Sequence, residues 1–245
     1  MLITSISGIR GTIGGVAGEG LTPHDILRFA TGYASWLRQS SGVSQPTVVL
    51  GRDARLSGEM VRDCLVGALN AMGVNVLDLG LSTTPTVELA VPEEDAQGGI
   101  ILTASHNPKQ WNALKLLGPK GEFLNASEGE KVLALAQESP IFASIEAIGR
   151  TEHLGGWMEW HVDHALELDL VDATSIRSKK LKVAVDAVNS TGGIIMPMLL
   201  EALGCEVVEV NCEPTGHFAH NPEPLPAHLS ELSQVVVDQQ CDLGI

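Results

Sequence analysis

The sequence predicts an α/β protein with two successive α/β domains whose sheets are mixed and mostly parallel. Two patterns favour this fold class: short runs rich in valine, isoleucine and leucine, and helix-like apolar periodicity between them. The third observation is size, because 245 residues with 44% hydrophobic residues suffice for one large domain or two ordinary ones. In such folds ligands gather outside the carboxyl ends of the strands.

Four runs have the composition of strands that are covered on both faces. They are residues 46–50 (PTVVL), 74–79 (VNVLDL), 98–103 (GGIILT) and 182–186 (KVAVD). The segment 112–124 predicts a hairpin around a Pro-Lys-Gly turn, which suggests an antiparallel edge.

Helix signals separate the first strands. Thr22 and Pro23 are a suitable N-cap and first-turn pair for a helix over about 23–39. Ser57 is expected to cap a second helix, which Gly73 ends. The apolar residues of that helix at helical spacing are Val61, Leu65, Ala68 and Met72.

Gly155 and Gly156 mark a plausible boundary within 150–157, between a helical segment and another helix that carries Trp157, Trp160, Val162 and Leu166. We therefore expect domains at 1–152 and 153–245. The second domain should hold the strand 182–186, a helix over about 193–203 ended by Gly204, the strand 205–210, a proline-rich loop and a last helix.

The final residues, Asp242 to Ile245, have the pattern of the start of a buried strand. Because the chain stops there without the rest of that strand, we expect it to be a fragment of a longer protein.

The overall charge excludes some classes of partner. The formal net charge of −15 offers no cluster of lysines and arginines for a nucleic-acid backbone. The first residues, MLITSISGIRG, lack the basic and long apolar regions typical of a secretory leader, and no later run is apolar enough to span a membrane. The four scattered cysteines have neither the spacing of a disulfide framework nor that of a zinc motif. These features predict a cytoplasmic protein that binds neither nucleic acid nor membranes.

The stretch 100–108, IILTASHNP, passes from an apolar strand directly into Ser105, His106, Asn107 and Pro108. One interpretation is a hydrogen-bonded turn, which the local spacing alone favours. The other is a nucleophile or phosphoryl carrier exposed at a strand end. No GxSxG elbow surrounds Ser105, so a Ser-His-Asp triad is not indicated.

Two further segments combine glycine with arginine. Arg10 lies between Gly8 and Gly11 in a loop that is either a flexible hairpin or a phosphate-binding cation site. Arg52 and Arg55 flank Asp53, where ligand contact competes with an internal ion pair to Asp53 and a helix cap.

Lys115 could return along the hairpin to the Ser105 site, as an electrostatic clamp or a proton-transfer group. The pairs His161/His164 and His217/His220 have metal-compatible spacing but no clear third ligand. We therefore assign no zinc site.

Several motifs together resemble the α-D-phosphohexomutases, in their order and at about their separations. The later segments KVAVDAVNSTGG and GHFAHNPEP are similar to the second domain of that family, so the resemblance spans essentially the whole chain. The motifs of the first domain are Gly8-Ile9-Arg10-Gly11, Gly51-Arg52-Asp53, Thr103-Ala104-Ser105-His106-Asn107-Pro108 and Asn112-Ala113-Leu114-Lys115.

The resemblance implies an enzyme that interconverts hexose 1-phosphates and 6-phosphates through a phosphoserine and a hexose bisphosphate. Ser105 would carry the phosphoryl group, Arg10 would steady phosphate, His106 would line the site and Lys115 would transfer a proton. Asn107 and Arg52 are further phosphate-binding candidates.

The resemblance also implies Mg²⁺ bound to an oxygen of Ser105, with its other ligands after Ile245. Two more domains would follow in the same chain, so the fragment is expected to be inactive alone. The substrate prediction leans to glucosamine phosphate; mannose or glucose phosphate, or a sugar-phosphate-binding module without catalysis, are the alternatives.

Overall fold

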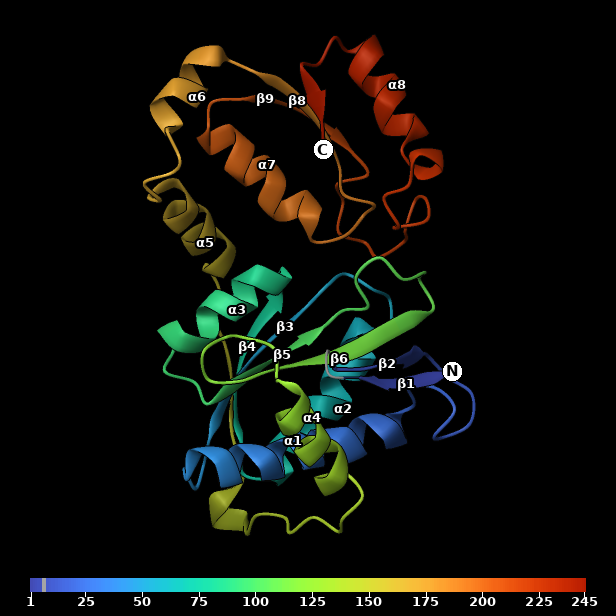
Figure 1. Ribbon diagram of the computed structural model, residues 1–245, viewed down its shortest axis with the longest axis vertical. Coiled ribbons are helices and arrows are strands. Elements are labelled where there is room, and N and C mark those ends of the chain that lie inside the picture. The colour runs from blue at the N-terminus through green and yellow to red at the C-terminus, as the bar shows by residue number, and fades with distance from the viewer. Residues whose placement is uncertain (6–7) are drawn as a thin grey trace. The chain divides into compact units, whose positions relative to one another are not determined.

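The computed structural model describes residues 1–5 and 8–245, so Ser7, which precedes the motif Gly8-Ile9-Arg10-Gly11, lies outside the described residues. The chain divides into two compact units (Figure 1), and each has the α/β fold class that the sequence predicts. The first unit is Met1–Arg52, Ser57–Ala104 and Gln110–Gly155; the second is Asp53–Leu56, Ser105–Lys109 and Gly156–Ile245.

The first unit holds a seven-stranded mixed sheet in the order β1-β2-β6-β5-β3-β4-β7. Strands β5, β3, β4 and β7 are mutually parallel, whereas β1, β2 and β6 join the sheet through antiparallel pairs. The strand bounds are β1 Leu2–Ser5, β2 Gly8–Thr12, β3 Thr47–Arg52, β4 Asn75–Leu81, β5 Gly98–Leu102, β6 Trp111–Leu117 and β7 Thr151–His153.

The predicted hairpin 112–124 is only partly correct. Its turn forms, with the Gly121 amide donating to the Gly118 carbonyl, but the returning arm is reduced to a bridge between Leu117 and Phe123. The antiparallel edge that the hairpin suggests is confirmed, but it consists of β6, β2 and β1, because β2 pairs with the other side of β6.

Helices cover the sheet of the first unit from both sides (Figure 1). Alternate strand residues such as Val48 and Leu50 share one core cluster with α1, α2 and α4. On the other face, Val87 and Val91 of α3 lie where side chains at Gly51 and Gly99 would stand. The helix bounds are α1 Pro23–Ser41, α2 Gly58–Ala71, α3 Thr84–Glu93, α4 Ala126–Leu135 and the 3₁₀ helix η1 Ile145–Ala147.

Two of the three predicted helix signals are confirmed. Thr22 caps α1 in a reciprocal capping box with Asp25, and Gly73 takes the left-handed φ of 74° just after α2. Ser57 precedes α2 but is not its cap, because it already has helical dihedrals and makes no capping hydrogen bond. Its hydroxyl instead accepts a hydrogen bond from the Asn112 side chain at 3.0 Å.

The second unit holds a three-stranded parallel sheet in the order β10-β8-β9, with α7 packed on β8 and β9. Leu200 shares a buried cluster with Val183 and Val185 of β8, and α5 packs on α7. The bounds are α5 Trp157–Leu166, α6 Ala173–Lys179, β8 Lys182–Asp186, α7 Gly192–Ala202, β9 Glu206–Val210, η2 Pro226–His228, α8 Ser230–Asp238 and β10 Leu243–Gly244.

The strand predicted at 182–186 and the helices at Trp157 and 193–203 are confirmed. Two expectations are wrong: the segment just before Gly155 is the edge strand β7 rather than a helix, and the terminal strand is exposed, with 40% of Leu243 accessible. No helix in the described part of the chain is long and apolar enough to cross a membrane.

Candidate active site

Arg10 and Lys115 project from the same face of the first unit's sheet. Arg10 of β2 pairs with Ala113 of β6, and Lys115 lies two residues further along β6. Because side chains two residues apart share a face, Arg10 and Lys115 are diagonal neighbours on paired strands. The register therefore brings together two of the cations that the sequence singled out.

The backbone at position 8, two residues before Arg10, requires glycine. It takes a φ of 117°, and a Cβ there would collide with the Leu114 carbonyl oxygen and lie 3.0 Å from the Lys115 Cα. Any side chain at Gly8 would thus force β2 away from β6. The glycine brings the backbone of β2 close to the strand that carries Lys115.

Lys115 is partly buried beside one ring and one carboxylate. Its Nζ lies 5.7 Å from the centroid of the Phe123 ring. Burial raises the pKa of Glu88 on α3, while the positive charge of Lys115 acts to lower it. Lys115 thus faces the side of the sheet that α3 partly covers.

Arg52 lies on the opposite face from Arg10 and Lys115. In the β3–β5 ladder it pairs with Leu102, next to the pair of Leu50 with Ile100 on the large core side. Its Nη2 pairs with Glu59 of α2 at 3.2 Å. A phosphate-binding role for Arg52 stays a prediction.

Ser105 takes a left-handed conformation three residues after β5 ends. Its φ is 55°, a region that costs a non-glycine residue about 1–2 kcal/mol. Ser105 and His106 are exposed, and Asn107 is half-buried. A serine held in this uncommon conformation needs support from its surroundings.

Arg55 supplies that support and is the functional residue that sequence reasoning left unassigned. It is only 2% exposed, and its Nε pairs with Asp53 at 3.0 Å. Its Nη1 donates to the Pro108 carbonyl at 2.9 Å, and its Nη2 donates to the carbonyls of Ser105 and Asn107 at 2.7 and 2.8 Å.

The ion pair with Asp53 was one of the two open interpretations, and it is confirmed. Burial lowers the pKa of Arg55, whereas the Asp53 charge raises it, and arginine stays protonated at any physiological pH. The available signal was the pattern of two arginines flanking an aspartate; the three carbonyl contacts, some 50 residues away, leave no local trace.

Two features of the proline-rich loop contact the Asp53–Leu56 segment within the second unit. The Phe218 ring centroid lies 5.0 Å from the Arg55 guanidinium carbon. Gly216 has a φ of 72°, and a Cβ there would collide with the Ala54 carbonyl oxygen. The loop containing GHFAHNPEP therefore packs against the arginine that holds the Ser105 segment.

The loop after β8 is tied together by polar side chains. His220 Nε2 lies 2.9 Å from Asp186 Oδ2, and Asn189 donates from its side chain to the His217 carbonyl at 3.0 Å. Val188 and Asn189 both have left-handed φ values, 49° and 56°. The carboxyl end of β8 is thus an ordered, strained turn.

The histidine pairs have ordinary structural partners. His164 stacks on Trp160 with ring centroids 3.6 Å apart, and His220 bonds to Asp186. Among residues 1–5 and 8–245, no three His, Cys, Asp or Glu side chains form a group that could hold a metal.

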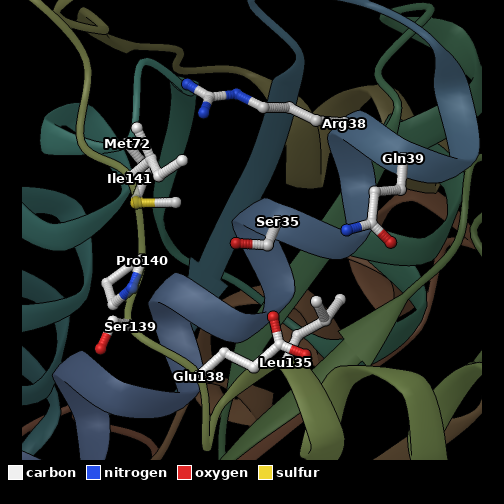
Figure 2. Close-up of a pocket in the computed structure, with 9 residues that line it drawn as sticks. All are labelled: Ser35, Arg38, Gln39, Met72, Leu135, Glu138, Ser139, Pro140 and Ile141. Atoms are coloured by element: carbon white, nitrogen blue, oxygen red, sulfur yellow. The ribbon is translucent and has the colours of Figure 1, made fainter.

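A cavity of about 250 Å³ lies in the first unit, away from every residue predicted to act on a substrate. Figure 2 shows Met72, Pro140 and Ile141 beside Ser35 of α1. The Ser35 hydroxyl donates to the Thr31 carbonyl at 2.8 Å. The cavity is lined by helix and loop residues and is not part of the candidate active site.

Comparison with known proteins agrees with this architecture. The family description "Phosphoglucomutase/phosphomannomutase, alpha/beta/alpha domain I" matches residues 2–140, and the corresponding domain II description matches residues 159–245.

Individual relatives give the same result. A phosphoglucomutase/phosphomannomutase of Thermococcus kodakarensis is 34% identical over 96% of this chain and 52% of its own length. A probable phosphoglucosamine mutase of Methanosarcina barkeri is 35% identical over 100% of this chain and 52% of its own. The crystal structure of a putative phosphomannomutase from Thermus thermophilus has a TM-score of 0.82 and 28% identity, covering 96% of this chain and 52% of that one.

The chain spans about half the length of the curated relatives that it matches. Because the two domain descriptions together match most of its residues, the chain belongs to the phosphoglucomutase/phosphomannomutase family.

Proposed function

We propose that this chain carries the phosphoserine part of a phosphohexomutase site, which interconverts hexose 1-phosphate and hexose 6-phosphate. The observation that carries the proposal is Ser105, exposed in a left-handed conformation after β5 and braced by a buried arginine. Membership in a family whose relatives are named mutases supports the reaction class.

In the proposed first step, Ser105 enters the reaction as phosphoserine. A hydroxyl oxygen of the sugar phosphate attacks phosphorus, the bond from phosphorus to Ser105 Oγ breaks, and a bisphosphate forms. The hydroxyl proton moves by way of Lys115 to the departing Oγ. The second step reverses this transfer with the other phosphate of the bisphosphate, returning phosphoserine and the isomerised sugar phosphate.

Charge neutralisation and positioning are what such an in-line transfer requires. Arg10 and Lys115 project from one face of the sheet, as expected for cations that steady phosphate. In the proposed reaction His106 lines the site around Ser105 and Asn107 contacts phosphate.

Magnesium is proposed as the metal, with an oxygen on Ser105 as one ligand. It would offset the charge of phosphoserine, about −1.5 to −2 near neutral pH. The described residues offer no cluster of three carboxylates, histidines or cysteines to complete the set. Asp53 is committed to Arg55, so the remaining ligands are proposed to lie outside this chain.

Glucosamine phosphate is the substrate we favour, because several relatives are named phosphoglucosamine mutases. Mannose or glucose phosphate is the alternative, supported by relatives named for those sugars. We propose a cytoplasmic location for such an enzyme, since its substrates are phosphorylated sugars.

The experiment is a mutase assay on the natural protein that contains this chain, with glucosamine, mannose and glucose phosphates in turn. Ser105→Ala should lower kcat by on the order of 10⁴-fold, because the covalent carrier is lost. Lys115→Met should lower it by about 10²–10⁴-fold, the range for losing a proton-transfer group.

Arg62→Met is the matched control. Arg62 pairs with the buried carboxylate of Asp78 and has no proposed role in transfer. Turnover by Ser105→Ala at the wild-type rate would refute the mechanism. Sugar-phosphate binding with no turnover of any of the three sugars would instead support a binding module.

A further inference from the structure

We propose that Arg55 is a positioning residue, which acts through the backbone of Ser105–Lys109 to aim two amide groups at phosphate. The inference rests on the proposed function, because it assigns a purpose to the support of a phosphoserine. It concerns groups that the motif comparison does not single out: the guanidinium of Arg55 and the N–H groups of His106 and Lys109.

The N–H donors of the Arg55 guanidinium bind oxygen atoms of the protein itself. Four of its hydrogen-bond contacts go to Asp53 and to the carbonyls of Ser105, Asn107 and Pro108. An arginine has five N–H donors in a rigid planar fork, so little capacity is left for a ligand. The Arg55 side chain is also 0% exposed. Arg55 therefore influences phosphate through the segment that it holds.

Peptide planarity converts these contacts into an orientation of donors. In a trans peptide, the carbonyl of one residue and the N–H of the next point in opposite directions, and no described peptide bond is cis. When Arg55 draws in the Ser105 carbonyl, the His106 N–H is turned away from it. In the same way, because Arg55 holds the Pro108 carbonyl, the N–H of Lys109 points away from Arg55.

Those two amides are available to a ligand. His106 and Lys109 are exposed, and within the described part of the chain their backbone N–H groups have no acceptor. The peptide after Asn107 contributes no donor, since Pro108 lacks an N–H. Two outward N–H groups fixed beside Ser105 in the chain form the kind of backbone donor pair that binds phosphate oxygens.

The contacts of Arg55 also maintain the left-handed φ of Ser105. A segment with this conformation persists only where its surroundings over-determine it. The carbonyls of residues 105, 107 and 108 all converge on one buried cation, which is such a constraint. Without the Arg55 guanidinium, Ser105 should leave its left-handed conformation, and the N–H groups of His106 and Lys109 should lose their fixed orientation.

The test compares Arg55→Lys with wild type and with Arg62→Met. Lysine keeps the charge but cannot serve Asp53 and three carbonyls at once. Arg62 forms ion pairs with Asp63 and Asp78. Arg62→Met therefore shows the effect of losing an arginine that is paired with aspartate but does not contact the Ser105 segment. Unfolding midpoints in urea identify any variant that is merely unfolded.

Two readouts follow in the natural protein that contains this chain. The first is the NMR order parameter of the His106 and Lys109 amides without ligand, expected near 0.85 in wild type and below about 0.6 in Arg55→Lys. The second uses glucose 1,6-bisphosphate as phosphoryl donor. Phosphate transfer to Ser105 should slow by about 100-fold in Arg55→Lys with little change in KM, and the downfield shift of the two amides on phosphorylation should disappear.

Unchanged order parameters in Arg55→Lys would overturn the proposal. So would mobile amides with undiminished transfer and shifts, which would make Arg55 a structural residue only. Both results leave phosphorylation of Ser105 intact. If wild-type Ser105 accepts no phosphate, the proposed function fails, and the phosphate-directed role of Arg55 fails with it.

Discussion

Asp25 links the loop between β2 and α1 to the start of that helix. Its carboxylate accepts hydrogen bonds from the Thr22 hydroxyl at 2.6 Å and from the Gly18 amide at 3.1 Å. Burial acts to raise the pKa of Asp25, but these bonds and the charge of Arg28 together hold it below the ordinary value. The loop that follows Arg10 is therefore anchored by one ionised side chain.

Asp25→Asn should destabilise the chain by about 1 kcal/mol at pH 7, because it removes a charge-assisted cap. Since the folded-state pKa is depressed, this stability is present above the unfolded pKa of about 3.9 and is lost as pH falls through the folded value. Urea unfolding at pH 7 and pH 3 measures it. The exposed Glu19→Gln is the control, and equal midpoints for both variants at pH 7 would contradict the account.

His220 gives the second unit a pH dependence of opposite sign. Burial acts to lower its pKa, but the Asn221 carbonyl, Asp186 and the charge of Glu231 raise it above the ordinary value. Both ring nitrogens face oxygen atoms, at 2.9 Å each, which suits the doubly protonated ring.

We expect Asp186→Asn to cost more stability at pH 6 than at pH 8.5. Because the pKa of His220 is higher in the folded state than in the unfolded state, protonation of His220 stabilises the fold. This stabilisation is fully present below the unfolded pKa of about 6.5 and is lost as pH rises through the folded pKa. Urea midpoints of wild type and variant at the two pH values measure the difference. A difference in urea midpoint between wild type and Asp186→Asn that is constant with pH would argue against the charged pair.

At the scale of elements, Tyr33 joins α1 to the sheet beneath it. Its buried hydroxyl lies 2.6 Å from the Leu117 carbonyl oxygen and 3.1 Å from that of Gly99. Burial raises the pKa of Tyr33, so the hydroxyl stays a donor. A side chain at Gly98 would collide with this hydroxyl. One phenol thus fixes the helix against β5 and β6, the strands that precede Ser105 and carry Lys115.

Tyr33→Phe should lower the free energy of unfolding by about 1–3 kcal/mol, because it leaves buried carbonyl groups short of a donor. Ser35→Ala is the matched control, since the Ser35 hydroxyl donates to the Thr31 carbonyl of its own helix and its loss should cost less than about 1 kcal/mol. Tryptophan fluorescence in urea follows both variants. Equal losses in the two would show that the contact between helix and sheet adds nothing.

Sequence patterns predicted the elements that carry strong local signals and missed those decided by distant contacts. Thr22-Pro23 and the apolar run KVAVD identified α1 and β8. Helix α3 was not predicted, because it contains Pro85 in its first turn and Pro92 near its end, and proline inside a segment usually argues against a helix. Ser57 does not cap α2 because it already has helical dihedrals, and its hydroxyl accepts a hydrogen bond from Asn112, 55 residues away.

The candidate site divides in the same way. Ser105, Arg10 and Lys115 were singled out by motif resemblance, and the strand register puts the two cations on one face. Arg55 could not be chosen over Arg52 from sequence, because both flank Asp53. The difference is in burial: Arg55 turns inward to three carbonyls, whereas Arg52 pairs with Glu59.

At the scale of the whole molecule, the chain covers about half of each relative named above. We predict that residues 1–245 expressed alone fold but turn over hexose phosphates at least about 10³-fold more slowly than a full-length relative, since the described residues offer no group of three side chains that could hold the proposed metal. Coupled assays on the purified chain measure this. Turnover comparable to that of the Thermococcus kodakarensis relative would contradict it.

The central claim is that Ser105 carries the phosphoryl group. The most direct measurement is phosphopeptide mapping by mass spectrometry, after the natural protein containing this chain is incubated with glucose 1,6-bisphosphate. The account predicts phosphate on Ser105 in wild type and none on the same peptide in Ser105→Ala. A protein that turns over hexose phosphates with no phosphate on Ser105, or with its phosphate on another residue, would contradict it.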